Sequence, residues 1–314
     1  MSVRILPGDC RTVLPTLPAG SVQCCVTSPP YYGLRDYGVA GQMGQESSPA
    51  EYVADMVALF REVRRVLADD GTLWLNIGDS YANPGHSKGN PGSGRNSAAK
   101  AEIGWVKPYS KTGEGLKNKD LIGIPWEMAF ALRADGWYLR SDIIWHKPNP
   151  MPESCTDRPT SAHEHVFLFA KRDRYFYDAD AIKETATASP RAVSSRSKAT
   201  DKQQLEGRQL NGNLGWDRPE MGRNARNVWT IATQPYSSAH FATMPPALAE
   251  RCIQAGTKPG DTVLDPFGGA GTTGLVADRL GRSAVLIELN PAYAALGSNR
   301  IADDAGLFAS VAAE

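Results

Sequence analysis

Two consecutive prolines follow an apolar segment near the start of the chain, in the stretch Ser28-Pro29-Pro30-Tyr31. The preceding run, Ser21–Thr27, predicts a strand that is buried on both faces of a sheet. Proline donates no backbone hydrogen bond, so this strand has to end here. The end leaves carbonyl groups without ladder partners beside exposed aromatic rings. Such a corner offers hydrogen-bond acceptors and a stacking surface to a ligand.

A second candidate site is the glycine-rich stretch DPFGGAGTTG, Asp265–Gly274, which follows a predicted strand and opens a predicted helix. Gly269 and Gly271 allow a tight turn and a close approach of the backbone to a ligand. Glu288 ends the next predicted strand, where an acid can accept both hydroxyls of a ribose. The pattern predicts a site for an adenosine-containing cofactor.

This stretch could hold one of three ligand types or form a purely structural turn. A phosphate-binding P-loop requires a lysine that the turn lacks. The pattern G-x-G-x-x-G of dinucleotide sites does match Gly269–Gly274, but the carboxylate of Asp265 would repel a pyrophosphate. The same carboxylate suits the ammonium group of S-adenosylmethionine. A structural turn explains poorly why Phe267 and two threonines gather at the carboxyl end of a strand, where ligands bind.

Both stretches resemble motifs of one enzyme family. Residues 27–31, TSPPY, look like the catalytic tetrapeptide of DNA methyltransferases that act on exocyclic amino groups, and residues 265–273 look like their cofactor motif. The catalytic motif precedes the cofactor motif, which is similar to the circularly permuted β-class. Shorter similar stretches include 145–149 (WHKPN) and 163–164 (HE), and the match covers most of the chain except 84–119 and about 174–226.

The resemblance implies methyl transfer from S-adenosyl-L-methionine to the amino group of a base flipped out of double-stranded DNA. The catalytic residues would be Ser28, Pro29, Pro30 and Tyr31. The Ser28 hydroxyl and the Pro29 carbonyl would accept the two N–H groups of the amine and stabilise its developing positive charge. Tyr31 would stack on the flipped base. Serine at the first motif position favours N4 of cytosine, with N6 of adenine as the alternative.

The resemblance also implies the cofactor-binding residues. Asp9 would accept from the adenine amino group, and Glu288 would bind the ribose. The turn would frame the methionine part, and the segment 240–245 would close that end. The full implied set is Asp9, His240, Phe241, Asp265, Phe267, Gly269, Gly271, Thr272, Thr273 and Glu288. We expect no metal, because the histidines at 163 and 165 lack a fourth ligand at a fitting spacing.

The composition excludes several other classes of protein. Lysine plus arginine and aspartate plus glutamate both number 34, so no overall field indicates a polyanion partner. Five cysteines without metal-ligand spacing fit a reduced, cytoplasmic and DNA-associated chain. No apolar run approaches the ~20 residues that span a bilayer. No cysteine follows a proline, and Cys24 and Cys25 lie in a predicted buried strand, which argues against methylation of a ring carbon.

Strands alternating with helices predict an α/β, Rossmann-like fold with a parallel, doubly wound sheet. The expected strands are 3–6, 21–27, 72–80, 138–145, 165–171, 262–267 and 283–289. The first expected helix begins at Pro49 and ends before Gly71, and the next two run over about 125–135 and 245–256. The fourth begins at the glycine-rich turn and continues through residue 280. The fifth begins at Pro291.

Two polar segments interrupt this pattern. Residues 84–119 carry seven basic and two acidic residues and predict a mobile loop that could clamp DNA. The expected organisation is a catalytic part over 1–171, a target-recognition insertion over 172–234 and a cofactor-binding part over 235–314. Arginine, lysine, asparagine and glutamine in the insertion can read base edges and phosphates. A homodimer and a cognate restriction endonuclease are compatible partners.

Overall fold

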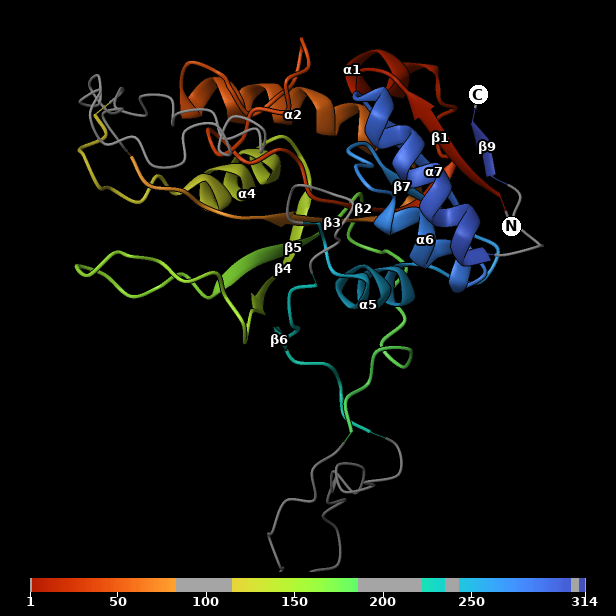
Figure 1. The fold of residues 1–314 in the computed structure, drawn as a ribbon. Coiled ribbons are helices and arrows are strands. Elements are labelled where there is room, and N and C mark those ends of the chain that lie inside the picture. The colour runs from red at the N-terminus through yellow and green to blue at the C-terminus, as the bar shows by residue number, and fades with distance from the viewer. Residues whose placement is uncertain (1, 83–114, 186–221, 235–242, 306–310, 314) are drawn as a thin grey trace, which may run out of the picture. The chain divides into compact units, whose positions relative to one another are not determined.

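The computed structural model describes residues 2–82, 115–185, 222–234, 243–305 and 311–313 (Figure 1). Its strands are β1 (Val3–Pro7), β2 (Val22–Thr27), β3 (Leu67–Ile77), β4 (Tyr138–His146), β5 (His163–Ala170), β6 (Val228–Thr230), β7 (Thr262–Asp265), β8 (Ser283–Glu288) and β9 (Val311–Ala313). Its helices are α1 (Cys10–Val13), α2 (Pro49–Val66), α4 (Ile124–Ala134), α5 (Pro246–Gly256), α6 (Thr272–Arg279) and α7 (Pro291–Ala305), with a 3-10 turn at Leu14–Thr16.

The strands form one sheet in the order β6-β4-β5-β3-β2-β7-β8-β1-β9. Strand β5 runs antiparallel to both of its neighbours, β3 and β4, while the other described pairs are parallel. The expectation of a parallel sheet is therefore wrong at β5. The segment between β4 and β5, residues 147–162, contains no helix that could carry a crossover, and it returns the chain in the opposite direction.

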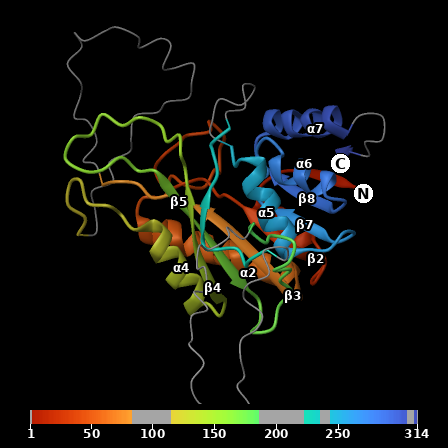
Figure 2. The same cartoon turned by 90° about the horizontal axis from the view of Figure 1, so that it is seen from below.

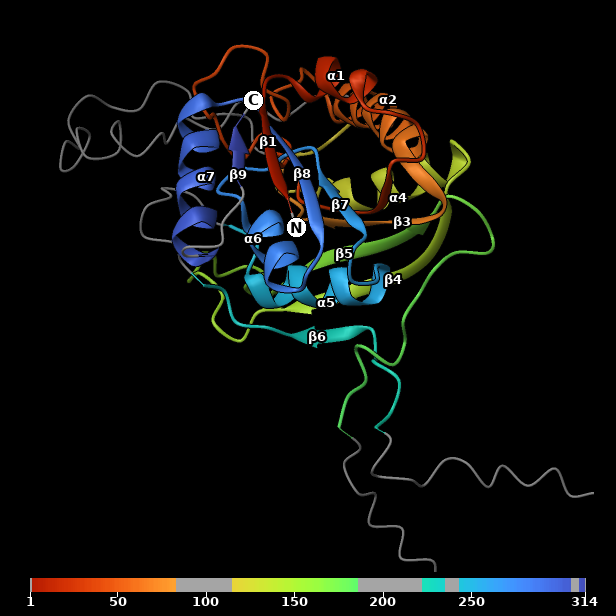
Figure 3. The ribbon, with the colours of Figure 1, turned by 90° about the vertical axis from the view of Figure 1, so that its right-hand side faces the viewer.

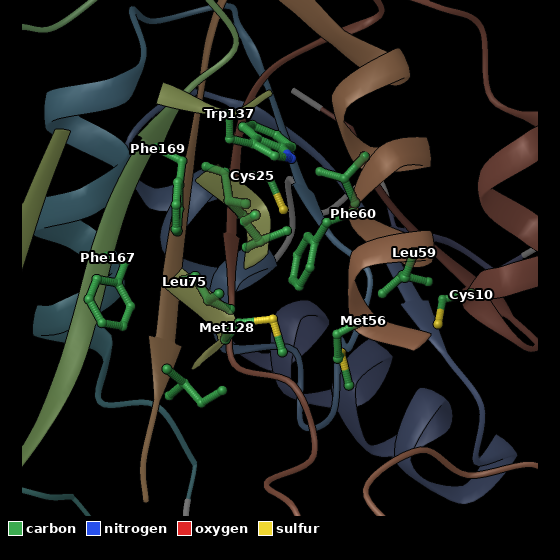
Figure 4. Close-up of a cluster of buried hydrophobic side chains, with 14 of the residues drawn as sticks. Cys10, Cys25, Met56, Leu59, Phe60, Leu75, Met128, Trp137, Phe167 and Phe169 are labelled. Atoms are coloured by element: carbon green, nitrogen blue, oxygen red, sulfur yellow. The ribbon is translucent and has the colours of Figure 1, made fainter. Parts of the chain in front are cut away.

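Helices cover both faces of this sheet, as a doubly wound fold requires. Figure 3 shows α1, α2 and α4 on one face and α5, α6 and α7 on the other, and Figure 2 shows α5 in front of the central strands. The core under α2 and α4 includes Met56 and Phe60 of α2, Met128 of α4, and Leu75 and Phe167 of the sheet (Figure 4). The Rossmann-like fold class is confirmed.

The beginning of helix α2 is set by local sequence. The Ser48 side chain accepts from the Glu51 N–H at 3.2 Å, and Pro49 occupies the first turn, as expected from the sequence. The helix ends at Val66 and not near Gly71. Leu67 is already extended and pairs with Val22 of β2. The residues from Leu67 onward therefore belong to strand β3, although the helical periodicity predicted that the helix would include Leu67.

The short strands β6 and β9 were not expected, because three residues carry too little periodicity to predict a strand. The chain divides into two units, one of which is 179–226, with 179–185 and 222–226 as its described residues. Within this unit, the backbones of Glu184 and Arg223 exchange two hydrogen bonds of 2.9 Å, and the Glu184 carboxylate pairs with Arg223 and Arg226.

None of the helices within the described ranges combines the length and the apolar content needed to cross a membrane.

Candidate active site

The carboxyl ends of β1, β2, β7 and β8 lie at one edge of the sheet, because these strands are parallel and adjacent. This edge receives the Ser28–Tyr31 corner after β2, the glycine-rich turn after β7, Glu288 at the end of β8 and Asp9 after β1. The reversed direction of β5 brings its first residues, His163 and Glu164, to the same edge. Two distant motifs and a third element therefore meet there.

The carbonyl groups of the two prolines in the corner differ in their hydrogen bonding. The Pro30 carbonyl accepts a hydrogen bond of 2.9 Å from the buried hydroxyl of Tyr52 on α2. Within the part of the chain that the structure describes, no donor contacts the Pro29 carbonyl. The corner therefore ties one carbonyl to the core and leaves the other, next to Ser28, as an acceptor.

Tyr31 is held by its hydroxyl group. This hydroxyl donates to the Glu164 carboxylate at 2.6 Å and lies 3.4 Å from Asn76 Oδ1. The Ser28 hydroxyl donates to it at 3.3 Å. Burial, and then the negative charge of Glu164, raise the pKa of Tyr31 well above its ordinary value, so the phenol keeps its proton.

Glu164 is fixed from two further sides. Asn76 Nδ2 donates to it at 3.0 Å, and Lys147 forms an ion pair with its other oxygen. The Lys147 and Glu164 side chains are only 18% and 16% exposed, so this pair is poorly screened by solvent. The Lys147 ammonium also lies 4.7 Å from the centroid of the Trp145 ring.

The ring of Tyr31 passes over Gly78, just after the end of β3. A Cβ atom at position 78 would lie 2.7 Å from Cε2 of Tyr31, closer than such atoms approach in proteins. Glycine at this position thus creates the space that the ring occupies.

Asp265 connects the corner to the turn. One carboxylate oxygen accepts from the Thr27 hydroxyl at 2.7 Å and from the Phe267 N–H at 3.0 Å, and the other accepts from the Thr273 hydroxyl at 2.7 Å. Asp265 is only 5% exposed, and burial raises the pKa of its carboxyl group. Its oxygens bind internal donors that join β2, β7 and α6, and its contact with the ammonium group of the cofactor stays a prediction.

The turn after β7 is tight and is packed against α7. Gly271 precedes α6 with a φ of 75°, and a Cβ there would lie 3.1 Å from the Cα of Gly297. Arg300 donates to the Ala270 carbonyl at 3.0 Å and to the Thr272 hydroxyl at 2.9 Å. The backbone of the turn is thereby held in place from the side of α7.

Glu288 faces this turn. Its two carboxylate oxygens accept from the N–H groups of Gly269 at 2.7 Å and of Asn290 at 2.8 Å, and burial raises its pKa. Each carboxylate oxygen has a further lone pair, which fits the two hydroxyls of a ribose. A carboxylate, and no lysine in the turn, also fits a cationic cofactor better than a phosphate.

Asp9 lies beside Glu288, since the Gly8 N–H donates to the Glu288 carbonyl at 2.8 Å. Its carboxylate caps α1 by accepting from the Arg11 N–H at 2.8 Å, and it pairs with the Arg11 guanidinium. Burial opposes ionisation, but the hydrogen bonds from Arg11 hold the pKa of Asp9 below its ordinary value.

His240 and Phe241 lie outside the described residues. Phe267 is partly buried against the core. In the ranges that the structure covers, no group of three metal-ligating side chains is present, and His165 contacts Asp142 at 2.9 Å instead. Cys24 and Cys25 are fully buried, and burial raises the pKa of the Cys24 thiol to about 12. These thiols are unsuited to nucleophilic attack on a ring carbon, as the sequence predicted.

A family model whose description is DNA methylase, of the N6/N4 type, matches residues 22–299. The chain belongs to this family. The type II methyltransferase M.XycI of Xanthomonas campestris pv. cyanopsidis is 48% identical over 297 residues, which cover 95% of this chain and 87% of that protein. M.SmaI of Serratia marcescens is 47% identical, over 96% of this chain and 91% of its own length.

The fold also matches a solved structure of a putative DNA modification methylase from Thermus thermophilus in complex with S-adenosyl-L-methionine. The TM-score is 0.62 at 24% identity, with 99% of this chain and 98% of the other covered. At this identity the likeness shows the fold. The turn with Glu288 has the chemistry to receive an adenosine-containing, cationic cofactor such as S-adenosyl-L-methionine.

Four side chains of this DNA methyltransferase site were not among the predicted site residues: Tyr52, Asn76, Lys147 and Glu164. The stretches at 145–149 and 163–164 resemble the family, which was a signal for the last two. The contact of Glu164 with Tyr31 could not be predicted, because a parallel β5 would have placed Glu164 at the opposite edge of the sheet.

Proposed function

We propose that this DNA methyltransferase transfers a methyl group to N4 of a cytosine that is flipped out of double-stranded DNA. The observation that carries the proposal is the Pro29 carbonyl, an acceptor that follows Ser28 in the chain. The buried carboxylate of Asp265 joins Thr27, just before Ser28, to Thr273 of the cofactor turn. Bound S-adenosyl-L-methionine supplies an activated methyl group on its sulfonium.

The acceptors meet the chemical difficulty of an exocyclic amine. The lone pair of such an amine is delocalised into the base, so the nitrogen is a poor nucleophile. Ser28 Oγ and the Pro29 carbonyl accept its two N–H groups, turn the nitrogen toward tetrahedral geometry and stabilise the positive charge that develops on it. The prolines fix both acceptors, so little reorganisation is needed during transfer.

The flipped base needs a surface that replaces its lost stacking. The Tyr31 ring supplies this surface, with its position fixed by Glu164 at one end and by the space over Gly78 beneath it. Holding the base and the methyl donor in line is worth ~7–11 kcal/mol of the barrier in well-oriented systems.

On the cofactor side, Glu288 binds the ribose and Asp9 the adenine amino group. The backbone of Gly269–Thr273 and the ring of Phe267 contact the methionine part, and Asp265 holds the turn in register with the corner. His240 and Phe241 close that end in this proposal.

Cytosine is favoured over adenine by the residue at position 28. A neutral hydroxyl accepts one N–H and adds no charge beside the base, whereas the family's adenine enzymes more typically carry aspartate or asparagine there. N6-methyladenine is the alternative product. We further propose that the region 172–234 reads the target sequence, that 84–119 contacts DNA, and that a cognate restriction endonuclease cuts the unmodified site.

Purified protein incubated with duplex DNA and S-adenosyl-L-methionine labelled in its methyl group tests the proposal. Nucleoside analysis of the digested DNA should give N4-methylcytosine. N6-methyladenine would overturn the choice of base, and an unlabelled duplex would overturn the function. Ser28→Ala should lose turnover by roughly 100-fold while it still binds the cofactor.

A further inference from the structure

The Ser28 hydroxyl can act as a donor or as an acceptor, and only one of these roles serves the proposed reaction. The target amine brings N–H donors, so Ser28 Oγ has to present a lone pair and direct its own proton elsewhere. A serine hydroxyl rotates freely unless a partner fixes it. The direction of its hydrogen bond therefore determines whether the corner attracts or repels the amine.

The partner of Ser28 is the Tyr31 hydroxyl, and the surroundings of Tyr31 fix the direction of this bond. Asn76 donates its Nδ2 hydrogens to the Glu164 carboxylate at 3.0 Å and to the His165 carbonyl at 3.2 Å, so its Oδ1 faces Tyr31 as an acceptor. Glu164 Oε2, 2.6 Å away, is an acceptor as well. The phenolic proton points to these acceptors, and Tyr31 can only accept from Ser28.

The far end of the chain of hydrogen bonds is an ionised carboxylate that has no proton to give. Lys147 forms an ion pair with the second oxygen of Glu164, and both side chains are largely buried. Two donors, Lys147 and Asn76, thus hold Glu164 as a carboxylate in one orientation. The sequence of donors is Ser28 to Tyr31 to Glu164, with no reversal possible while Glu164 is charged.

We propose that Glu164 is a positioning residue that fixes the polarity of this chain, so that Ser28 Oγ always presents its lone pair to the target amine. The proposal rests on the proposed function, because it assigns the amine as the group that Ser28 accepts from. Glu164 itself touches neither the base nor the cofactor in this role and acts through Tyr31.

The experiment compares Glu164→Gln, Tyr31→Phe and the double variant in the full-length protein. The glutamine amide can donate to Tyr31 and reverse the chain, so that Ser28 presents its proton to the amine. We expect kcat to fall roughly 100-fold in Glu164→Gln. Tyr31→Phe releases Ser28 to rotate and should lose roughly 10-fold. In the double variant there is no hydroxyl to reverse, so its kcat should return to the level of Tyr31→Phe.

This recovery separates polarity from a structural role. The double variant retains the unpaired Lys147 of Glu164→Gln, so loss of folding or of charge balance would not be repaired by it. The KM for S-adenosyl-L-methionine should stay within about twofold of the wild type, because Glu164 is not part of the cofactor turn. A double variant as slow as Glu164→Gln, or slower, would overturn the proposal.

Two controls complete the design. Glu153→Gln makes the same chemical change in the β4–β5 segment, where Glu153 pairs with Arg158, and should keep wild-type kcat. If Glu164→Gln does not fold, the same comparison is made with Lys147→Met added, which leaves no unpaired buried charge; recovery on adding Tyr31→Phe is again required. A wild-type protein inactive on DNA would refute the proposed function, whereas an active wild type with an active Glu164→Gln refutes only the role of Glu164.

Discussion

The corner after β2 and the turn after β7 lie at the same edge of the sheet but are held in different ways. The corner depends on side chains that are distant in sequence: Tyr31 contacts Glu164, 133 positions away, and Tyr52 on another element binds the Pro30 carbonyl. The turn depends on backbone groups within Asp265–Thr273, on one facing carboxylate, Glu288, and on Arg300 from the side of α7. The corner is thus a tertiary construction, and the turn is mainly a local one.

This difference follows from the tasks that we propose for the two regions. A cofactor bound through backbone N–H groups and a carboxylate needs a chain conformation, which glycines provide. An acceptor pair for an amine needs fixed directions for side-chain hydrogen bonds, which requires partners on several strands. Mutations in the corner should therefore change turnover, and mutations in the turn should change cofactor affinity. Asp265, which contacts both, should change both.

The largest effect is expected for Asp265→Ala, which tests whether the two regions are coupled. Three donors, from Thr27, Phe267 and Thr273, would lose a buried partner, with an expected cost of about 3 kcal/mol in the free energy of unfolding. Thr273→Val removes one of these bonds and should cost about 1 kcal/mol. Urea unfolding measures both variants. Equal costs for the two would show that Asp265 does not join the regions.

Gly78→Ala should affect the corner alone. The added Cβ would lie 2.7 Å from the Tyr31 ring, so the ring has to shift from the position in which its hydroxyl binds Glu164. A displacement of about 1 Å in a catalytic group can cost roughly 100-fold in rate, and we expect a loss of that order in kcat. Calorimetry should give unchanged affinity for S-adenosyl-L-methionine. In a Tyr31→Ala background the same change should cost nothing further; an additional loss there would contradict the proposed contact.

The parts that could be predicted from the sequence are those that depend on neighbours in the chain. Ser48 and Pro49 indicated the start of α2, and the glycines of 269–271 indicated the turn before α6, because caps and turns act within a few residues. The end of α2 was wrong, since Leu67 pairs with Val22 and sheet pairing is not visible in helical periodicity. The reversal of β5 was missed for the same reason, and with it the contact between Glu164 and Tyr31.

Gly271→Ala should affect the turn alone and more weakly. A left-handed φ of 75° costs a non-glycine residue ~1–2 kcal/mol, and the new Cβ would also press on Gly297 at 3.1 Å. Gly281→Ala is the matched control, with a φ of 72° and, among the described residues, no atom within 4 Å of the added Cβ. Both variants should lose stability in thermal unfolding, but only Gly271→Ala should bind S-adenosyl-L-methionine more weakly. Equal affinities would mean that the contact with Gly297 does not shape the site.

The smallest effect concerns the protonation of Glu288. Burial raises its pKa above the ordinary value, and the ionised form accepts from the two ribose hydroxyls more strongly than the protonated form, in which one oxygen has become a donor. Affinity for S-adenosyl-L-methionine should therefore be full at neutral pH and fall to about half when the pH reaches this raised pKa, where half of the carboxyl is protonated. Glu288→Gln should bind more weakly at neutral pH and show a flatter pH profile in calorimetry. Asp265 also has a raised pKa, but its protonation would raise the unfolding temperature as the pH falls through that pKa, because the folded state binds this proton more tightly than the unfolded state. A fall in affinity that persists in Glu288→Gln would assign the pH dependence to Asp265 and not to the ribose contact.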